Sequence, residues 1–344
     1  MNDRILRALR RESVDATPVW FMRQAGRSLP KYREKRADRE MFALLRDPAA
    51  AAEITAMPLD YYPVDAAVLY NDLVTPFLAA GVDVRMEPGI GPVVARTVET
   101  AADVSALRPF QPREGLAYCL DQIKLLVGRL DVPVVGFVGA PFTLCSYLIQ
   151  GRHSRNQDAI KAFIHRQPEV WNQLAAFWAE HLAEFGIAQY EAGARAIQIF
   201  DSWVGAIGPE DYEQFVLPHS LNMFQKLEAA GVPTIHFYTG NPALLPLIAQ
   251  AGGTAISVDW RLPIDIAWDL IGDDRAIQGN LDPAVLLAGV EPALRKTRDI
   301  LERVGGRPGH IFNLGHGLLP ETNHEVIRAV TDFVHEYDAG RTGA

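Results

Sequence analysis

The sequence predicts an α/β protein that folds as a single (β/α)8 TIM barrel with a small inserted β-hairpin. Short apolar runs rich in β-branched residues recur along the chain, and a long amphipathic stretch follows each of them. Strands that alternate with helices are typical of a parallel sheet, and eight such repeats favour a closed barrel. The eight expected strands are Pro18–Met22, Ala66–Tyr70, Val132–Val138, Ala196–Phe200, Thr234–Tyr238, Ala255–Val258, Ala276–Gln278 and His310–Leu314.

The segments between these strands support the prediction. Within residues 167–193, large apolar side chains recur at the spacing of one helix face, which predicts a long amphipathic helix. After the second strand, two shorter runs at residues 82–86 and 93–98 flank the glycine-containing segment 87–92, which predicts the hairpin. No linker or solenoid repeat interrupts the chain, so we expect one catalytic domain over residues 1–344.

Composition and charge exclude several classes of protein. The 344 residues are 49% hydrophobic and 22% charged, as in globular rather than disordered proteins, and the net charge of −9 argues against a nucleic-acid partner. Cys119 and Cys145 form no CxxC pair, which suits a reducing compartment. The N-terminus lacks a signal-peptide pattern, and the uncharged stretch 132–151 is broken by prolines and glycines. We therefore expect a cytoplasmic protein with no membrane partner.

The ends of the expected strands predict an enzyme. In a (β/α)8 barrel the active site lies at the carboxyl ends of the strands. Polar, ionisable and small residues fall at these ends, whereas the runs themselves are apolar. The residues concerned are Arg23 and Arg27, Asn71 and Asp72, residues 141–147, Asp201 and Ser202, Tyr238, Asp259 and Trp260, Gly279 and Asn280, and residues 315–317.

A basic segment follows the first expected strand. From Trp20 to Arg39 there are seven basic and two acidic residues, a local charge of +5 in a chain of net charge −9. The planar guanidinium binds carboxylate or phosphate through paired hydrogen bonds, so Arg23 and Arg27 predict a small polyanionic ligand. Gly26 between them would allow a close backbone approach or a positive φ. A solvated basic loop explains the same charge pattern equally well.

Four further side chains at strand ends have two readings each. Asp72 is suited to stabilise a developing cation, and equally to cap a helix. His316 lies between two glycines, which suggests close backbone approach, although a lone histidine in a turn is more often structural. Tyr147 is either a donor to a ligand carboxylate or a core aromatic residue. Ser202 has no GxSxG elbow around it, so we expect a hydrogen-bond donor rather than a nucleophile.

The sequence contains no cofactor or metal motif. No GxGxxG follows a strand and no P-loop is present, so nucleotide cofactors lack support. No HExxH motif or His/Cys ligand spacing occurs, and no lysine stands out as a Schiff-base candidate. We expect chemistry without a cofactor and without a metal.

Four ordered motifs resemble the uroporphyrinogen decarboxylase family. The family's N-terminal signature, Pro-x-Trp-x-Met-Arg-Gln-Ala-Gly-Arg, is matched throughout by residues 18–27. Its second signature is matched by residues 136–147, and the segments 278–283 and 313–317 fit as well. The likeness therefore covers nearly the whole chain. One departure is Gln150, where the second signature usually continues to Glu; we expect it to alter local charge rather than activity.

This resemblance implies a homodimeric barrel that acts without cofactor or metal on a tetrapyrrole. The substrate implied is uroporphyrinogen III (or I), whose four acetate side chains lose CO2 to give coproporphyrinogen in porphyrin and haem biosynthesis. The resemblance gives Asp72, Arg23 and Arg36 catalytic roles, with Asp72 accepting hydrogen bonds from the pyrrole N–H groups. The substrate-binding residues that it implies are Arg23, Gln24, Ala25, Gly26, Arg27, Arg36, Asp72, Tyr147, Ser202 and His316.

Two competing interpretations are separable in principle. Zinc-dependent methyltransferases of the same barrel superfamily place a His-x-Cys at a strand end, whereas the comparable strand here reads His236-Phe237-Tyr238. A non-catalytic porphyrin or polyanion carrier would keep the arginines but would not need Asp72.

Overall fold

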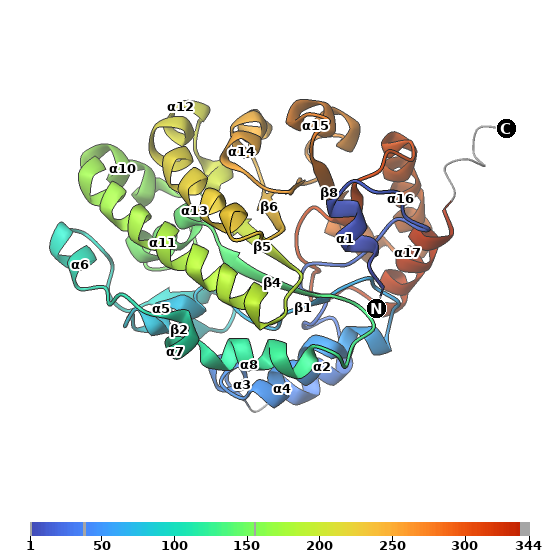
Figure 1. Cartoon of the computed structure of the whole chain (residues 1–344), viewed down its shortest axis with the longest axis horizontal. Coiled ribbons are helices and arrows are strands. Elements are labelled where there is room, and N and C mark those ends of the chain that lie inside the picture. The colour runs from blue at the N-terminus through green and yellow to red at the C-terminus, as the bar shows by residue number, and fades with distance from the viewer. Residues whose placement is uncertain (1, 37–38, 155, 338–344) are drawn as a thin grey trace.

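A parallel seven-stranded sheet forms the centre of the molecule, in a computed structural model that describes residues 2–36, 39–154 and 156–337. The strands follow one another in the order of the chain, and helices lie along the outside of the curved sheet (Figure 1). The strands are β1 (Ala67–Val68), β4 (Val134–Gly139), β5 (Ala196–Asp201), β6 (Thr234–Tyr238), β7 (Ala255–Ser257), β8 (Ala276–Leu281) and β9 (His310–Leu314).

The helices connect successive strands and pack against them. The long helix α11 contacts β4 and β5, α13 contacts β6, and α16 contacts β8. The α-helices are α1 (Arg4–Leu9), α2 (Pro30–Arg36), α3 (Met41–Leu45), α4 (Pro48–Ala56), α5 (Thr75–Ala79), α6 (Ala101–Ser105), α7 (Pro112–Gly115), α8 (Ala117–Leu126), α9 (Pro141–Gln150), α10 (Asp158–Arg166), α11 (Pro168–Ala192), α12 (Pro209–Asp211), α13 (Leu217–Ala229), α14 (Leu245–Ala251), α15 (Ile264–Ile271), α16 (Val290–Val304) and α17 (His324–Glu336). Short turns of other helix types are η1 (Met57–Asp60), η2 (Val204–Ala206), η3 (Tyr212–Val216), η4 (Pro242–Leu244) and η5 (Pro283–Ala288). Within the part of the chain that the structure describes, no helix is both long and apolar enough to cross a membrane.

The prediction of a closed eight-stranded barrel is wrong, because the first expected strand, Pro18–Met22, is not part of the sheet. It makes a single parallel bridge, between Val19 and Phe312 of β9, with two flanking backbone hydrogen bonds of 2.8 and 3.3 Å. The fold is therefore α/β and TIM-barrel-like, but the ring of strands stays open between β9 and β1.

Side chains explain this gap, because they accept hydrogen bonds from backbone N–H groups that would donate to a neighbouring strand in a regular sheet. The Asp65 carboxylate accepts from the N–H of Val19 at 2.7 Å, and the Asn313 side chain accepts from the N–H of Met22 at 3.2 Å. On the other side of the gap, the N–H of Tyr70 donates to Thr55 Oγ1 at 2.8 Å, so β1 is regular over only two residues of the expected Ala66–Tyr70.

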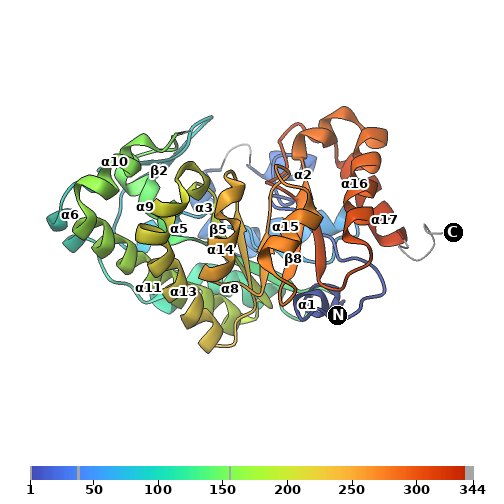
Figure 2. The same cartoon turned by 90° about the horizontal axis from the view of Figure 1, so that it is seen from above.

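The predicted hairpin is confirmed. Strands β2 (Val84–Glu87) and β3 (Gly91–Val94) pair antiparallel as a separate two-stranded sheet. The hairpin is held to the end of α9, because the N–H of Val94 donates to the carbonyl of Gly151 at 2.7 Å and Val93 forms a bridge with Arg152. Figure 2 shows β2 beside α9 and α10.

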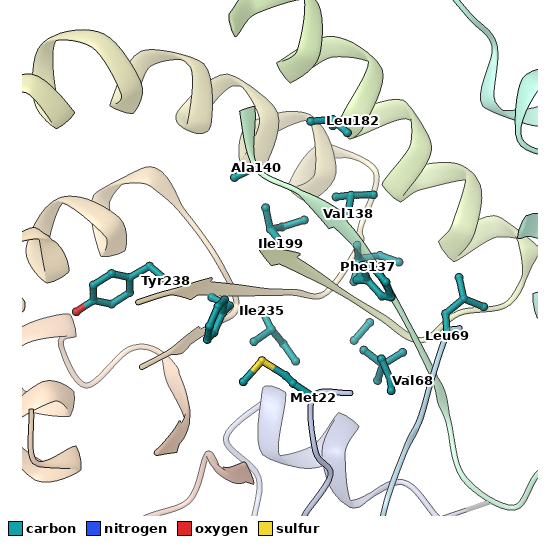
Figure 3. Packing of buried hydrophobic residues seen from close by; sticks show 14 of the residues in the cluster. Met22, Val68, Leu69, Phe137, Val138, Ala140, Leu182, Ile199, Ile235 and Tyr238 are labelled. Atoms are coloured by element: carbon teal, nitrogen blue, oxygen red, sulfur yellow. The ribbon is translucent and has the colours of Figure 1, made fainter. Parts of the chain in front are cut away.

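The two faces of the sheet have different neighbours. In Figure 3, Val138 lies on the side of β4 that faces α11 and its Leu182, whereas Phe137 lies on the other side with Val68 and Met22. This is the alternation that a strand imposes on successive side chains. Side chains on the inner face, such as that of Phe137, therefore line the space inside the curved sheet.

A buried polar network fills part of that inner space. Trp20 Nε1 donates to Gln278 Oε1 at 2.9 Å, and Gln278 Nε2 donates to Gln198 Oε1 at 2.9 Å. Because Gln198 lies on β5 and Gln278 on β8, strands that are not neighbours, this bond crosses the interior of the half-barrel. The space available to a ligand is therefore confined to the ends of the strands.

Candidate active site

A cavity of about 350 Å³ opens at the carboxyl ends of the strands, a size within the roughly 300–1,000 Å³ of small-molecule sites. Residues that are far apart in the sequence line it together: the turn after the first run, the loop after β1, the helix α9, the ends of β5 and β9, and the hairpin. Eight of the ten predicted substrate-binding residues lie on its walls, namely Arg23, Ala25, Gly26, Arg27, Asp72, Tyr147, Ser202 and His316.

The turn that carries the arginines is a close-packed piece of backbone. Arg23 has a φ of 64°, in the left-handed region, where a residue other than glycine costs about 1 kcal/mol. Gly26 does not use the positive φ that its residue type permits; instead, a Cβ there would lie 2.7 Å from the carbonyl oxygen of Arg23. The residue types in this turn therefore follow from how tightly the chain folds before it reaches the cavity.

Gln24, the ninth predicted residue, is buried behind this turn. Its side chain accepts from the N–H of Phe21 at 3.0 Å and donates to the carbonyl of Ala66 at 2.8 Å. Gln24 is not among the described residues that line the cavity. The structure thus shows a side chain that fixes the arginine turn to the segment before β1.

The basic segment divides into two groups. Lys31, Lys35 and Arg39 pair with acidic residues on neighbouring helices and turns, as the solvated interpretation of the charge expects. Arg23 and Arg27 line the cavity, and neither has an acidic partner within ion-pair distance among the described residues. The two arginines available to an anionic ligand are therefore those that open the segment.

Arg36, the tenth predicted residue, ends α2 and does not line the cavity. Its guanidinium donates to the carbonyl oxygen of Arg39. It does lie close enough to Tyr70, which lines the cavity, for its charge to oppose the strong rise that burial causes in the pKa of that phenol. Arg36 thus acts through its charge on Tyr70, a cavity-lining residue, without being among the described residues that line the cavity.

Asp72, a cavity-lining residue, uses one of its two carboxylate oxygens in a hydrogen bond to the backbone. Oδ1 accepts from the N–H of Val74 at 3.0 Å, a local turn that opens α5. Among the described residues, no hydrogen bond reaches Oδ2. Burial raises the pKa of Asp72, while the Val74 N–H and the positive charge of Arg23 act in the opposite direction. A cation placed in the cavity would add to these two effects and stabilise the carboxylate.

Arg23 and Asp72 influence each other across the cavity. Although Arg23 projects into open space, the surrounding walls bury it enough to lower the pKa of its guanidinium, with Asp72 opposing that shift and Arg27 adding to it. The two side chains combine a positive and a negative group in one partly desolvated site. Such a site offers a cation to an anionic group of a ligand and a carboxylate acceptor to a ligand N–H group.

His316 is a neutral hydrogen-bond donor. Its Nδ1 accepts from the N–H of Gly317 at 2.8 Å, so the ring proton is on Nε2. Burial lowers the pKa of His316 to about 4, and the positive charge of Arg23 contributes to this shift. The imidazole is therefore uncharged near pH 7 and has Nε2–H free for a ligand acceptor.

The glycines on both sides of His316 are required by close contacts, as the sequence suggested. A Cβ at Gly315 would lie 2.8 Å from the backbone of Asp259 and from the Trp260 ring. A Cβ at Gly317 would lie 2.4 Å from Cδ of Arg23. The strand end of β9 therefore supports the Arg23 side chain.

Gly317→Ala is expected to lower kcat/KM for the substrate by about 10- to 100-fold, because misplacing a binding group by about 1 Å has effects of this order. The added methyl group displaces Arg23, a flexible side chain, so the thermal midpoint of unfolding should change little. Steady-state kinetics and thermal unfolding measure the two effects. Gly208→Ala is the matched control, since a Cβ at Gly208 meets nothing within 4 Å; equal losses in both variants would contradict this role of Gly317.

Tyr147 and Ser202 complete the polar part of the cavity. Tyr147 lies on α9, and burial raises the pKa of its phenol, so the hydroxyl remains protonated and can donate. Its ring meets the edge of Trp203 at 6.2 Å between centroids. Ser202 directly follows β5.

Gln150, the departure from the family signature, ends α9. Its side chain donates a hydrogen bond to the side chain of Gln157, and it is not among the described residues that line the cavity.

Sequence reasoning missed an aromatic wall of the cavity. Phe137, Phe200 and Phe237 come from the neighbouring strands β4, β5 and β6 and all line the cavity. Their rings meet edge to face, with centroids 5.4 Å apart between the first pair and 5.3 Å between the second. The sequence carries one signal for them, a phenylalanine at the last or the second-last position of each of these expected strands. The hairpin residues Met86 and Pro92 were also missed.

Asp201, the last residue of β5, is a buried carboxyl group beside the cavity. Its Oδ1 accepts from Thr143 Oγ1 at 3.0 Å, its Oδ2 has no partner among the described residues, and burial raises its pKa to about 7. Since the unfolded pKa is about 3.9, the native state holds a proton between about pH 4 and pH 7 that the unfolded state has lost. Asp201 thus stabilises the protein below about pH 4, and this contribution is lost as pH rises to about 7.

Asp201→Asn should remove this part of the pH dependence. The free energy of unfolding of the wild type, minus that of the variant, is expected to fall as pH rises from about 4 to about 7. Denaturant unfolding at a series of pH values measures this difference, in which the buried histidines cancel. A difference that is constant over the range would mean that Asp201 is already ionised in the native state.

Fold and cavity together define a TIM-barrel-like α/β protein with a pocket of arginine, aspartate and phenylalanine side chains at the carboxyl ends of its strands. The family model described as uroporphyrinogen decarboxylase (URO-D) matches residues 1–337. This chain belongs to that family.

Curated relatives agree over nearly their whole length. The chain is 47% identical over 337 residues to the uroporphyrinogen decarboxylase of Sorangium cellulosum, covering 97% of this chain and 96% of the relative. It is 46% identical to that of Streptomyces avermitilis, covering 97% and 94%. Among solved structures, a methyltransferase from Methanosarcina mazei shares the fold, with a TM-score of 0.81 at 21% identity over 97% of this chain and 98% of that chain.

Proposed function

We propose that this protein removes CO2 from the four acetate side chains of uroporphyrinogen III, giving coproporphyrinogen III in porphyrin and haem biosynthesis, without a cofactor. The observation that carries the proposal is the free Oδ2 of Asp72 beside Arg23 in a cavity with a phenylalanine wall. The 47% identity to a relative named uroporphyrinogen decarboxylase supports this choice of substrate.

Binding uses the two kinds of surface in the cavity. The rings of Phe137, Phe200 and Phe237 offer an apolar face to the macrocycle. Arg23 and Arg27 bind side-chain carboxylates, since a guanidinium forms paired hydrogen bonds with a carboxylate. His316 and Tyr147 add neutral donors, which orient carboxylates without adding further charge.

The chemistry relies on the substrate as its own electron sink. Protonation of a pyrrole at a ring carbon makes an iminium-like cation, which accepts the electron pair of the breaking bond between the acetate CH2 and its carboxylate. CO2 leaves, a proton adds to the CH2 carbon, and the ring carbon loses the proton that it had taken up, so each acetate takes up one proton in net balance and becomes a methyl group. Asp72 accepts hydrogen bonds from the pyrrole N–H groups and stabilises the cation, an effect worth about 3–4 kcal/mol in a preorganised site.

Arg23 is the better placed of the nearby donors to supply a proton. A free guanidinium, with a pKa above 12, is a poor acid, but burial lowers the pKa of Arg23. Tyr147 is less suitable because burial raises its pKa, and His316 is uncharged near pH 7 because its pKa is about 4. Arg36, which is not among the described cavity-lining residues, would act through its charge near Tyr70.

The alternatives are less well supported by the cavity. Likeness to a methyltransferase at 21% identity concerns the fold alone. Cys119 and Cys145 are buried in α8 and α9, and neither belongs to the described residues that line the cavity. A carrier would bind the same carboxylates, but it would gain nothing from a carboxylate of raised pKa at Asp72.

The proposal includes the setting in which the enzyme works. Residues 1–344 would form one catalytic domain, which would act as a cytoplasmic homodimer with no nucleic-acid or membrane partner. Analytical ultracentrifugation of the purified protein checks the dimer independently of activity.

The test of the function is an incubation of purified protein with uroporphyrinogen III, anaerobic and in the dark, with EDTA and no added cofactor. Products are oxidised and separated by their number of carboxylates. We expect a series of species from eight carboxylates down to four. Unchanged octacarboxylate, from protein shown to be folded by circular dichroism, would contradict the proposal and favour the carrier.

A further inference from the structure

Two tyrosines form a hydroxyl pair on the cavity wall that the proposed mechanism does not use. Tyr32 comes from α2 and Tyr70 from the segment after β1, and both line the cavity. Their hydroxyl oxygens lie 3.1 Å apart, and the rings meet edge to face with centroids 5.8 Å apart. Both residues are almost fully buried, with exposed fractions of 7% and 5%.

This pair has one proton more than it can use internally. One hydroxyl donates to the other, and the second hydroxyl then needs an acceptor of its own. No other hydrogen bond to either hydroxyl occurs among the described residues. Leaving a buried donor without an acceptor costs about 1–3 kcal/mol, so an acceptor in the cavity would stabilise the pair.

The surroundings of the pair favour an anionic acceptor. Burial raises the pKa of Tyr70 strongly, so the hydroxyl stays protonated and acts as a donor. The positive charge of Arg36 and the negative charge of Asp72 both act on the pKa of this phenol, in opposite directions, and the effect of Arg36 is the larger. No hydrogen bond joins Asp72 to either tyrosine among the described residues, and the neighbouring cavity-lining residues Met41 and Val68 are apolar.

We propose that the Tyr32–Tyr70 hydroxyl pair is a further binding element for a side-chain carboxylate of the tetrapyrrole, distinct from the arginine turn. The spare proton of the pair is donated to one carboxylate oxygen, and the positive charge of Arg36, which acts on Tyr70, attracts the same carboxylate. This inference rests on the proposed function for the identity of the ligand. The pair affects how tightly the substrate is held rather than the bond-breaking step, which takes place at Asp72.

The test uses Tyr32→Phe, Tyr70→Phe and the double variant, all of which keep the aromatic rings. The double change removes both donors and should raise KM for uroporphyrinogen by about 10- to 100-fold with kcat nearly unchanged, the effect of losing a hydrogen bond to a charged group. Each single change leaves one hydroxyl that can still donate to the carboxylate, so its effect should not exceed that of the double variant. Tyr118→Phe, on α8 and away from the cavity lining, is the matched control.

Equilibrium binding separates this inference from the proposed function. Anaerobic titration with uroporphyrinogen III measures Kd whether or not turnover occurs, so a protein that binds without turnover still tests the pair. The same 10- to 100-fold loss is expected in Kd. A double variant that binds as tightly as the wild type, or variants that lose kcat and thermal stability while KM stays unchanged, would overturn the inference.

Discussion

Replacement of Asp72 by Asn is expected to lower kcat for decarboxylation by about 100- to 1,000-fold, the usual cost of removing one preorganised electrostatic group. The variant removes the negative charge that stabilises the protonated pyrrole. It keeps a side-chain oxygen that can accept from the N–H of Val74, so the local turn should remain. Binding of coproporphyrinogen should weaken far less than turnover, because the arginines and the phenylalanine wall are unchanged.

Asp282→Asn is a matched control for this change. The Asp282 side chain accepts from the N–H of Ala284 at 2.9 Å, the same two-residue spacing as in the Asp72 turn, and Asp282 is not among the described residues of this cavity. Kinetics and ligand titration on the two variants separate charge from turn geometry. Turnover that is normal in Asp72→Asn would remove this carboxylate from the mechanism.

The second large effect is expected for Arg23→Gln. Arg23 is expected to form a desolvated ion pair with a substrate carboxylate, and loss of one partner of such a pair costs about 2–5 kcal/mol, which corresponds to a fall in kcat/KM of about 30- to 4,000-fold. Gln keeps a polar side chain at a position of positive φ, so the backbone strain of the turn is not altered. Both KM and kcat should change, because Arg23 is expected to bind a carboxylate and to supply a proton.

The kinetic pattern distinguishes these two roles of Arg23. If Arg23 only binds substrate, saturating uroporphyrinogen restores kcat and leaves KM as the main effect. Arg96→Gln is a suitable control, since Arg96 is highly exposed and pairs with Asp103 at 2.6 Å, outside the cavity lining. Wild-type kcat/KM in Arg23→Gln would contradict the proposed carboxylate contact.

The spacing of apolar residues predicted most of the fold, because apolar runs mark the segments that are buried in the folded protein. The strands expected at 234–238 and 310–314 agree with β6 and β9 residue for residue, and the helix expected within 167–193 is α11. β8 runs three residues beyond the expected run, through Gly279 and Asn280, which resemble a turn in the sequence. The open ring was not predictable, because the hydrogen bond from Val19 to the Asp65 side chain joins residues 46 positions apart.

The site was predicted where its residues are polar and missed where they are apolar. Arg23, Asp72 and His316 stand out because they are ionisable residues that directly follow apolar runs. In the sequence, Phe137 and Phe200 cannot be told apart from phenylalanines of the hydrophobic core. Only the curvature of the sheet turns their rings toward the cavity. Gln24 is a polar residue that was predicted to bind substrate but has a structural role. Its side chain forms hydrogen bonds to the backbone of Phe21 and of Ala66.

The measurement that tests the central claim most directly is a crystal structure of the protein with coproporphyrinogen III, grown anaerobically. The account expects the pyrrole nitrogens to lie about 3 Å from Oδ2 of Asp72, within hydrogen-bond distance, with a macrocycle face on Phe137, Phe200 and Phe237. If the pyrrole nitrogens lie more than about 4 Å from Asp72 and bond to another group, this carboxylate does not stabilise the cation and the mechanism proposed here is wrong.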